Sequence, residues 1–534
     1  MNPRFKIILP IIFAVLLAVG IFIGSRLNFS DKQSIRFLKS GSRSSDKINS
    51  VLNFIEEEYV DTVNKTILEE KAIADLLQNL DPHSVYITSK EVQEMREPLE
   101  GNFEGIGIEF NIFADTIRVV SVIAGGPSEQ LGIQAGDKIV KIEGKKAAGI
   151  KIKNKDVLSK LRGKGGTKVT ISVMRGHSKK LIDYSITRGT IPIYSVDVSY
   201  MLDKKTGYIK VSRFAETTYE EFLDKTSKLR AEGMKNLILD LRGNGGGLLS
   251  TAIKICDEFL EKGKVIVYTK GKSHPKETIL ATNKGILTDT KLALLIDEGS
   301  ASASEIVAGA IQDNDRGTII GRRSFGKGLV QRESMFADSS AIRLTVARYY
   351  TPTGRCIQKP YGKDLEDYYG EEYHRYQSGE LLHADSIHEN DSLKFKTPGG
   401  KTVYGGGGIT PDVFIPLDTA GRTPYLNELF VKGAFNQFCF DYADKNRNEL
   451  NKMSKEKFNA NFVVSEKIFN DFYSFSEKLG VKQNPREASI SRSLIENLLK
   501  ASIARQIWNN DGFYPVLNEK DKMLQKAQLL FDKQ

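Results

Sequence analysis

Apolar and polar positions follow two different periods along the chain, and the changes between them divide it into regions. Apolar residues recur at helical spacing from Ile48 to Tyr59 and again over residues 67–80. The second pattern stops at Asp81-Pro82, because proline has no N–H to donate and disfavours a helix before it. We therefore expect a helical region over residues 46–100.

The pattern changes over residues 101–188 to short β-like runs separated by glycine-rich turns. These runs are GIGIEF, TIRVVSVI, DKIVKIEG, KVTISVMR and DYSITRG, and NKDVLSKLR has the pattern of a single helix. This region is expected to fold as a small β-rich domain.

Strands and helices then alternate over residues 189–420, which predicts an α/β core built from β-α-β crossovers. Ligand sites in such sheets lie beyond the carboxyl ends of the strands. The segments NLILDLRGNGGG and LALLIDEGSASAS both run from a strand end into a helix, so we expect them to face one crevice. Residues 421–534 have a helical pattern whose role the sequence does not indicate.

The first residues have the pattern of a membrane segment. MNPRFK precedes 18 apolar residues, Ile7 to Gly24, which approach the roughly 20 needed to span a bilayer. No A-x-A cleavage site follows, so residues 1–24 are expected to be a retained signal anchor, with a polar linker over residues 25–45. Basic residues flank both ends of the segment and leave its orientation open.

Composition excludes several classes of protein. A chain of 534 residues is too long for one core. The net charge of +10 is concentrated between Lys141 and Arg188, a segment that contains fourteen basic residues and only three acidic ones. Without a nucleic-acid motif, we expect a solvated basic face and no nucleic-acid partner. Three dispersed cysteines and six histidines without HExxH spacing predict neither a disulfide framework nor a metal site.

Two motifs in the α/β core carry candidate chemistry. In SASASE, Ser302 and Glu305 fit a capping box, so a helix start competes with a catalytic role. In GRRSFGKGLVQRE, Lys327 lies between glycines, and Gln331 follows four residues later. Nucleotide binding is excluded, because neither GNGGG nor FGKG is a complete P-loop.

The β-rich region resembles a PDZ domain. EGIGIEF is similar to the carboxylate-binding loop and the strand after it, and GGPSEQLGIQAGDKIVKIEG is similar to the interior signature of that family. The resemblance implies that the backbone N–H groups of Gly105, Ile106, Gly107 and Ile108 receive the terminal carboxylate of a peptide that adds to the sheet.

Over residues 48–415 the chain resembles the carboxyl-terminal processing, or tail-specific, proteases. The matching features, in chain order, are LDPHS, the PDZ-like insertion, DLRGNGGG, SASASE and FGKGxVQ. The resemblance implies a protease core of ClpP/crotonase-like or tail-specific-protease type. It places the nucleophile at Ser302, the general base at Lys327 and a lysine-orienting glutamine at Gln331, with no cofactor.

Simple chemistry agrees with these roles. Lysine acts as a base only when neutral, and burial away from carboxylates favours the neutral amine. The Gln331 amide accepts a hydrogen bond without adding charge. The oxyanion of a tetrahedral intermediate needs donors, and we expect them from the N–H of Ala303 at a helix start and from Gly245 or Gly246.

The expected function is that of a serine endopeptidase on the periplasmic side of the inner membrane, in the cell envelope, anchored by its N-terminal segment. Its substrates are proteins or peptides with exposed C-termini, which the PDZ domain selects and which the basic face assists in binding. A homo-oligomer and an accessory activator stay open as partners. The alternative is a non-catalytic PDZ scaffold or chaperone, against which the intact set of Ser302, Lys327 and Gln331 argues.

Overall fold

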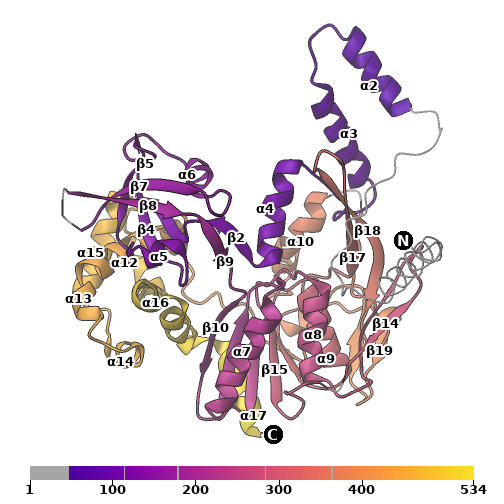
Figure 1. Cartoon of the computed structure of the whole chain (residues 1–534). Coiled ribbons are helices and arrows are strands. Elements are labelled where there is room, and N and C mark those ends of the chain that lie inside the picture. Colours follow the sequence, from indigo (N-terminus) through magenta and orange to yellow (C-terminus); the bar gives the residue numbers. More distant parts are fainter. Residues whose placement is uncertain are drawn as a thin grey trace, which may run out of the picture. The chain divides into compact units, whose positions relative to one another are not determined.

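The computed structural model describes residues 47–113, 115–176, 178, 180–282, 284–362 and 365–533. They form two compact units, one with residues 47–78, 83–92 and 332–344 and the other with residues 79–82, 93–331 and 345–533 (Figure 1). The expected anchor, residues 1–24, and linker, residues 25–45, lie outside the described residues. Across the described ranges, the model holds no helix with the length and apolarity that a bilayer crossing requires.

The smaller unit contains the two helices that the N-terminal periodicity predicts. They are α2 (Lys47–Glu58) and α3 (Lys65–Gln78). Strand β1 (Val85–Ile87) pairs in antiparallel register with the first residues of β18 (Ala341–Tyr350), with Ile87 opposite Ala341. Helix α4 (Ser89–Glu100), which begins in this unit, lies within the helical region expected over residues 46–100, although no separate helix was predicted there.

The β-rich module forms an antiparallel sheet with strand order β3-β4-β5-β7-β8. Residues Ile117, Ile139, Val157 and Ile171 are buried in its core, as the alternating pattern of the strands requires. The predicted strands and the predicted helix are confirmed. The elements are β2 (Asn102–Gly105), β3 (Ile108–Phe113), β4 (Thr116–Val122), α5 (Pro127–Gln130), β5 (Lys138–Ile142), β6 (Lys145–Lys146), α6 (Asn154–Leu161), β7 (Lys168–Met174), β8 (Leu181–Thr187) and β9 (Gly189–Pro192).

The protease core is an α/β sheet in the order β10-β11-β12-β15-β16-β21. Strands from β11 to β21 pair in parallel, and α7, α8 and α9 lie between them in sequence, so the predicted crossovers are confirmed. The elements are β10 (Val196–Met201), β11 (Thr206–Val211), α7 (Thr218–Ala231), β12 (Asn236–Asp240), α8 (Leu249–Phe259), β15 (Lys291–Ile296), α9 (Ala303–Asp313), β16 (Thr318–Gly321) and β21 (Val413–Phe414).

Both faces of this sheet are buried, as parallel sheets require. Along β12, Leu237 and Leu239 pack with α7, α8 and α9, whereas Ile238 packs on the opposite face with Leu524 and Phe531 of α17 (Lys522–Lys533). A second sheet joins β18 to β13 (Val265–Lys270), and β13 to β14 (Glu277–Leu280), while β17 (Leu329–Met335) also pairs with β18.

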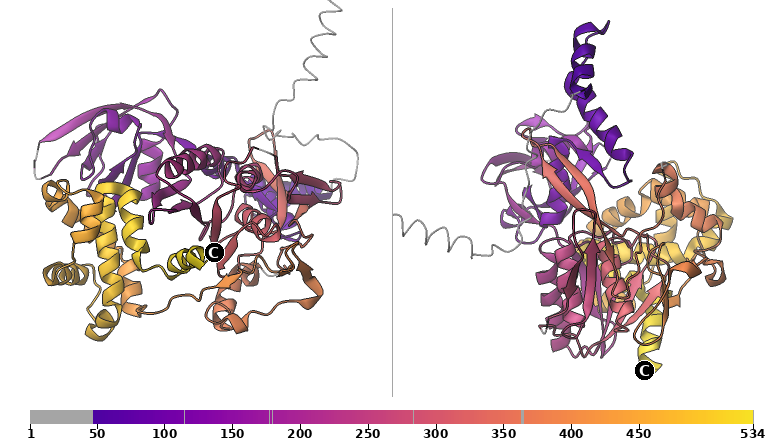
Figure 2. Two further views of the ribbon diagram at one scale, coloured as in Figure 1. Left: turned by 90° about the horizontal axis from the view of Figure 1, so that it is seen from below. Right: turned by 90° about the vertical axis from the view of Figure 1, so that its right-hand side faces the viewer.

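The region after the core is helical and has an aromatic core that includes Phe435, Phe438, Phe469 and Phe472. It contacts the β-rich module, because Arg118 on β4 forms an ion pair of 2.7 Å with Asp441 on α12. The left view of Figure 2 shows the C-terminal helices beside the strands of the β-rich module. The remaining elements are α10 (Leu365–Gln377), η1 (Ala384–Ser386), η2 (Asp391–Leu393), β19 (Lys394–Lys396), β20 (Thr402–Tyr404), α11 (Pro424–Val431), α12 (Ala434–Lys445), α13 (Arg447–Leu450), α14 (Lys455–Asn461), α15 (Glu466–Lys478), α16 (Pro485–Leu517) and η3 (Asn518–Lys520).

Candidate active site

The three serines before α9 have different surroundings. The Ser300 hydroxyl donates to the Leu241 carbonyl at 2.8 Å, and the Ser304 hydroxyl donates to the Asn244 carbonyl at 2.7 Å. Both side chains are buried and fasten α9 to the loop after β12. Ser302 is half-buried and has φ 55° and ψ −112°, a conformation that L residues rarely adopt. Backbone strain of this kind gathers at functional sites, which distinguishes Ser302 from its neighbours.

A buried carboxylate joins the Ser302 segment to the Lys327 segment. Glu305 Oε2 accepts the backbone N–H groups of Ser302 and Lys327, each at 2.8 Å. Glu305 Oε1 accepts the Ser324 hydroxyl and the Gly326 N–H. The capping-box pattern predicted the contact with Ser302 but not the other three. Burial raises the pKa of the Glu305 carboxyl to about 7, although these hydrogen bonds favour its charged form.

The Lys327 side-chain amine lies beside the amide predicted to orient it. Lys327 Nζ donates to Gln331 Oε1 at 3.2 Å, and Gln331 lies on β17. The flanking glycines allow a close backbone approach, since a Cβ on Gly328 would lie 2.9 Å from the Gln358 nitrogen. The roles of Ser302, Lys327 and Gln331 stay predictions, for which this arrangement supplies the geometry.

Tyr349 is a further contributor that the sequence analysis missed. Its hydroxyl lies 3.1 Å from the Ser302 carbonyl oxygen and also donates to the Lys327 carbonyl. The side chain is 1% exposed, and burial raises the pKa of its hydroxyl well above the ordinary value, so it is neutral. Tyr349 lies on β18, 22 residues after Lys327, and no local motif marks it.

The candidate oxyanion donors lie next to Ser302. A Cβ on Gly246 would lie 2.8 Å from Ser302 Cβ and 2.9 Å from the Ala303 nitrogen, so the glycine loop touches the start of α9. The Gly246 N–H donates to Asn244 Oδ1 at 2.9 Å and is already engaged. Gly245 has open space around its Cα. Because the Gly246 N–H is already engaged, Gly245 is kept as the candidate partner of Ala303, and this role stays a prediction.

The predicted carboxylate-binding loop lies between β2 and β3. The Ile106 carbonyl accepts the Ser128 N–H at 3.1 Å, and the Gly107 carbonyl accepts the Ile123 N–H at 3.0 Å. Ile106 is buried, Gly107 has φ 77°, Gly105 ends β2 and Ile108 begins β3. In the described part of the sheet β3 pairs only with β4, so its other edge can accept an added strand.

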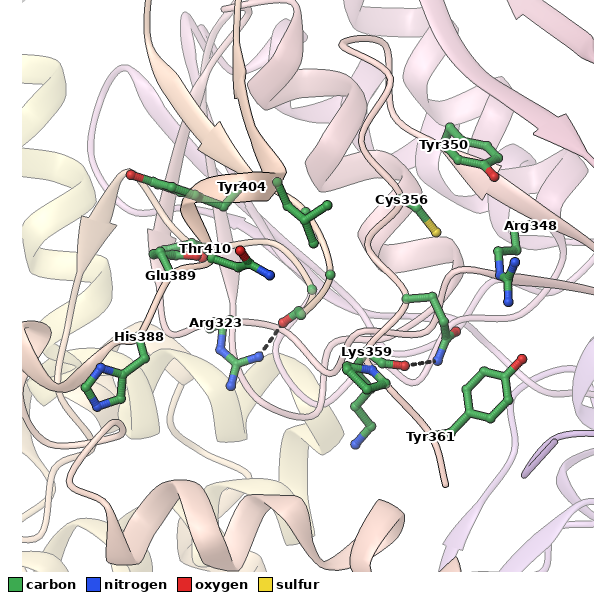
Figure 3. A pocket seen from close by; sticks show the side chains of 18 residues that line it. Arg323, Arg348, Tyr350, Cys356, Lys359, Tyr361, His388, Glu389, Tyr404 and Thr410 are labelled. Atoms are coloured by element: carbon green, nitrogen blue, oxygen red, sulfur yellow. Dashed lines mark hydrogen bonds between the residues drawn. The ribbon is translucent and has the colours of Figure 1, made fainter. Parts of the chain in front are cut away.

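A pocket of about 740 Å³ is lined by other residues of the protease core (Figure 3). Its lining includes Arg348, Tyr350, Gln358, Lys359 and the glycine cluster 405–408. Ser302, Lys327 and Gln331 are not among its lining residues. Gln358 connects the two places, because its Oε1 accepts the Gly328 N–H at 2.8 Å.

Over the described ranges, no group of three or more His, Cys, Asp or Glu side chains is placed to hold a metal ion. The chemistry at Ser302 can be written with the side chains and backbone groups above.

Comparison with known proteins identifies the class. The model of peptidase family S41 matches residues 205–366, that of the PDZ domain residues 118–175, and that of a family of unknown function, DUF8443, residues 425–509. The predicted PDZ domain and protease core are thereby confirmed.

Relatives agree with this class. The carboxy-terminal-processing protease of Bartonella bacilliformis is 39% identical over 317 residues, which cover 58% of this chain and 72% of the relative. The carboxy-terminal processing protease CtpA of Bacillus subtilis is 35% identical over 355 residues, 66% of this chain and 75% of the relative. The solved photosystem II D1 C-terminal processing protease is 24% identical, with 70% and 87% of the two chains covered and a TM-score of 0.36.

The chain belongs to the carboxy-terminal processing proteases of peptidase family S41. It is a serine-type peptidase with a PDZ domain, as the sequence motifs predicted.

Proposed function

We propose that the chain hydrolyses peptide bonds with Ser302 as nucleophile and Lys327 as general base. Neutral Lys327 takes the Ser302 proton while Ser302 Oγ attacks the substrate carbonyl carbon. The lysine ammonium then gives the proton to the leaving amine, and an acyl-enzyme remains. Water, deprotonated by the same amine, attacks the ester and releases the acyl product with Ser302 restored.

The observation that carries this proposal is the Glu305 carboxylate shared by the backbone N–H groups of Ser302 and Lys327. It brings the two segments together although Ser302 and Lys327 are 25 positions apart in the chain. Gln331 holds the Lys327 amine without adding a charge that would favour the ammonium. The N–H groups of Ala303 and Gly245 supply the oxyanion donors, and one such donor is worth roughly 3 to 4 kcal/mol.

The PDZ domain is proposed to bind substrate C-termini at Gly105 to Ile108, by adding the peptide to the free edge of β3. The basic face between Lys141 and Arg188 supports this by attracting carboxylates. An amidated C-terminus removes the recognised charge. A free-acid peptide is therefore expected to bind at least tenfold more tightly than its amidated twin, and equal affinity contradicts the assignment.

The proposed location is the periplasmic side of the inner membrane, and it rests on the apolar segment Ile7 to Gly24 alone. Fractionation of cells with protease added to intact spheroplasts tests it. A membrane-bound protein that added protease degrades supports the proposal, and a soluble or protected protein refutes it.

The catalytic assignment is tested on an unstructured substrate with an apolar tail. Ser302→Ala and Lys327→Ala are expected to abolish cleavage and to keep tail binding. Ser474→Ala is the control, since it removes an exposed hydroxyl on α15, outside the residues matched by the peptidase family model. Cleavage by Ser302→Ala at the wild-type rate would refute Ser302 as the nucleophile. A wild-type protein that binds the tail but never cleaves would instead leave the non-catalytic scaffold, which the family match does not favour.

A further inference from the structure

One carboxylate joins the C-terminal helix to the segment that leads into the glycine loop. Asp521 Oδ1 accepts the N–H groups of Met523 and Leu524, at 2.8 and 3.1 Å, and so caps α17. Its other oxygen, Oδ2, accepts Arg242 Nη1 at 2.7 Å. The Arg242 and Asp521 side chains are 19% and 18% exposed, which shields their ion pair from much of the solvent.

Arg242 is held from two opposite sides. Its Nε and Nη2 donate to the buried Asp240 carboxylate, with Nη2 at 2.6 Å from Oδ2. Nη1 points to Asp521. The Arg242 carbonyl accepts Lys210 Nζ at 3.0 Å, so the main chain is fixed at the same residue. Asp240 fixes one edge of the guanidinium, and Asp521 fixes the other.

The loop that follows Arg242, residues 243–246, packs against the candidate nucleophile Ser302. Gly243 donates its N–H to Asp297 Oδ1 at 2.8 Å, and the Asn244 carbonyl accepts the Ala301 N–H at 3.0 Å. Gly246 then packs against Ser302, where a Cβ would lie 2.8 Å from the Ser302 Cβ. Arg242 therefore stands at the start of the loop that carries the Gly245 N–H, which is fixed further along by Gly243 and Asn244.

We infer that Asp521 is a positioning residue of the protease, which acts through Arg242 to hold the 243–246 loop in register with Ser302. The inference rests on the proposed function, since it takes this loop as the source of an oxyanion donor. It gives a catalytic purpose to a contact made by α17, which lies outside the residues matched by the peptidase family model.

Asp521→Asn is the principal test. Asparagine keeps an oxygen that caps α17 and removes the charge that binds Arg242. Complete loss of one oxyanion donor lowers kcat about 100- to 1000-fold. A Gly245 N–H that is only displaced should cause a smaller loss, so we expect kcat to fall about tenfold with KM unchanged. The affinity for a peptide boronic acid, whose tetrahedral adduct uses the same donors, should fall by a similar factor. Tail binding measured in the Ser302→Ala background should not change.

Asp418→Asn is the matched control. Asp418 pairs at 2.9 Å with Lys522, the first residue of the helix that Asp521 caps. Within the part of the chain that the structure describes, it makes no hydrogen bond or ion pair with Arg242 or with residues 243–246. Its kcat should equal that of the wild type. If Asp521→Asn does not fold, Asp521→Ser keeps a capping oxygen and replaces it in every assay.

The outcomes separate this inference from the proposed function. If Ser302→Ala and Lys327→Ala are inactive but Asp521→Asn has wild-type kcat and boronate affinity, the inference alone fails. A fall in kcat that Asp418→Asn reproduces also overturns it, because the helix contact is then merely structural. If Ser302→Ala stays active, the proposed function itself fails.

Discussion

Ser302 and Lys327 are joined through one atom, because their backbone N–H groups both donate to Glu305 Oε2 at 2.8 Å. Neither side chain takes part in this contact. The candidate nucleophile and base are thus positioned relative to one another through their main chains.

Glu305→Gln is expected to lower kcat at least 100-fold. The carboxylate accepts four donors, whereas an amide would turn its own NH₂ toward two of them. Each buried donor left unpaired costs roughly 1 to 3 kcal/mol. Single-turnover cleavage at about pH 8 measures the loss, and a kcat within threefold of the wild type would contradict it.

Stability should depend on pH through the same side chain. Burial raises the pKa of the Glu305 carboxyl from 4.5 to about 7, so the folded protein holds this proton more tightly than the unfolded chain. The stability that this adds is fully present below about pH 4.5 and is lost as the pH rises through about 7. The shift corresponds to about 3 kcal/mol. Urea unfolding of wild type and Glu305→Gln between about pH 5 and 8 should show this loss only in the wild type, and parallel curves would exclude it.

Tyr349→Phe should reduce kcat about tenfold and leave KM unchanged. The variant keeps the buried ring but leaves the Lys327 carbonyl without the hydroxyl donor, at a cost of about 1 to 3 kcal/mol. Tyr350→Phe, at the adjacent position facing the pocket of Figure 3, is the control and should keep wild-type kcat. Equal kinetics for the two variants would count against a role for Tyr349.

The glycine loop offers a paired test. Gly246→Ala should abolish activity and lower the melting temperature, because Gly246 has φ 101° and its Cβ would meet the Ala301 oxygen at 2.7 Å. Gly245→Ala meets open space and should fold normally with its N–H retained. Cleavage and thermal unfolding of both variants check this, and tolerance of alanine at 246 would refute the described packing.

Asp441→Asn should loosen the PDZ domain from the helical region. It weakens the 2.7 Å pair with Arg118, whose guanidinium also lies 5.9 Å from the Phe440 ring centroid. Since both partners are partly exposed, we expect the free energy of separating the two regions to fall by roughly 1 kcal/mol. This corresponds to about a fivefold increase in the population of the separated state. Hydrogen exchange in β4 and α12 measures it. Asp471→Asn on α15 is the control, and the same exchange in both variants would contradict the prediction.

The sequence predicted the parts of this fold that local patterns specify. The helix at Asn154–Leu161 and the crossovers through α7, α8 and α9 follow from periodicity. The family resemblance identified the peptidase and its PDZ domain. It could not choose between Gly245 and Gly246, because that choice depends on where one side-chain amide, Asn244, accepts a hydrogen bond.

Contacts between residues far apart in the sequence could not be predicted, because no local pattern shows which of them folding brings together. Tyr349 acts from a strand whose residues carry no motif, and Asp521 meets Arg242 across 279 positions. The capping-box pattern found Glu305 but gave it a single partner, since the other three donors come from the 324–327 segment.

The separation of Arg242 from Asp521 also sets an order of events during synthesis. A ribosome adding about 5 to 20 residues per second needs roughly 15 to 55 s to pass from one to the other. Ser302 and Lys327 emerge within that interval, before the aspartate that steadies the loop beside them. A nascent chain would thus contain Ser302 and Lys327 for some time before Asp521 is added. Full peptidase activity is therefore delayed until translation has passed Asp521.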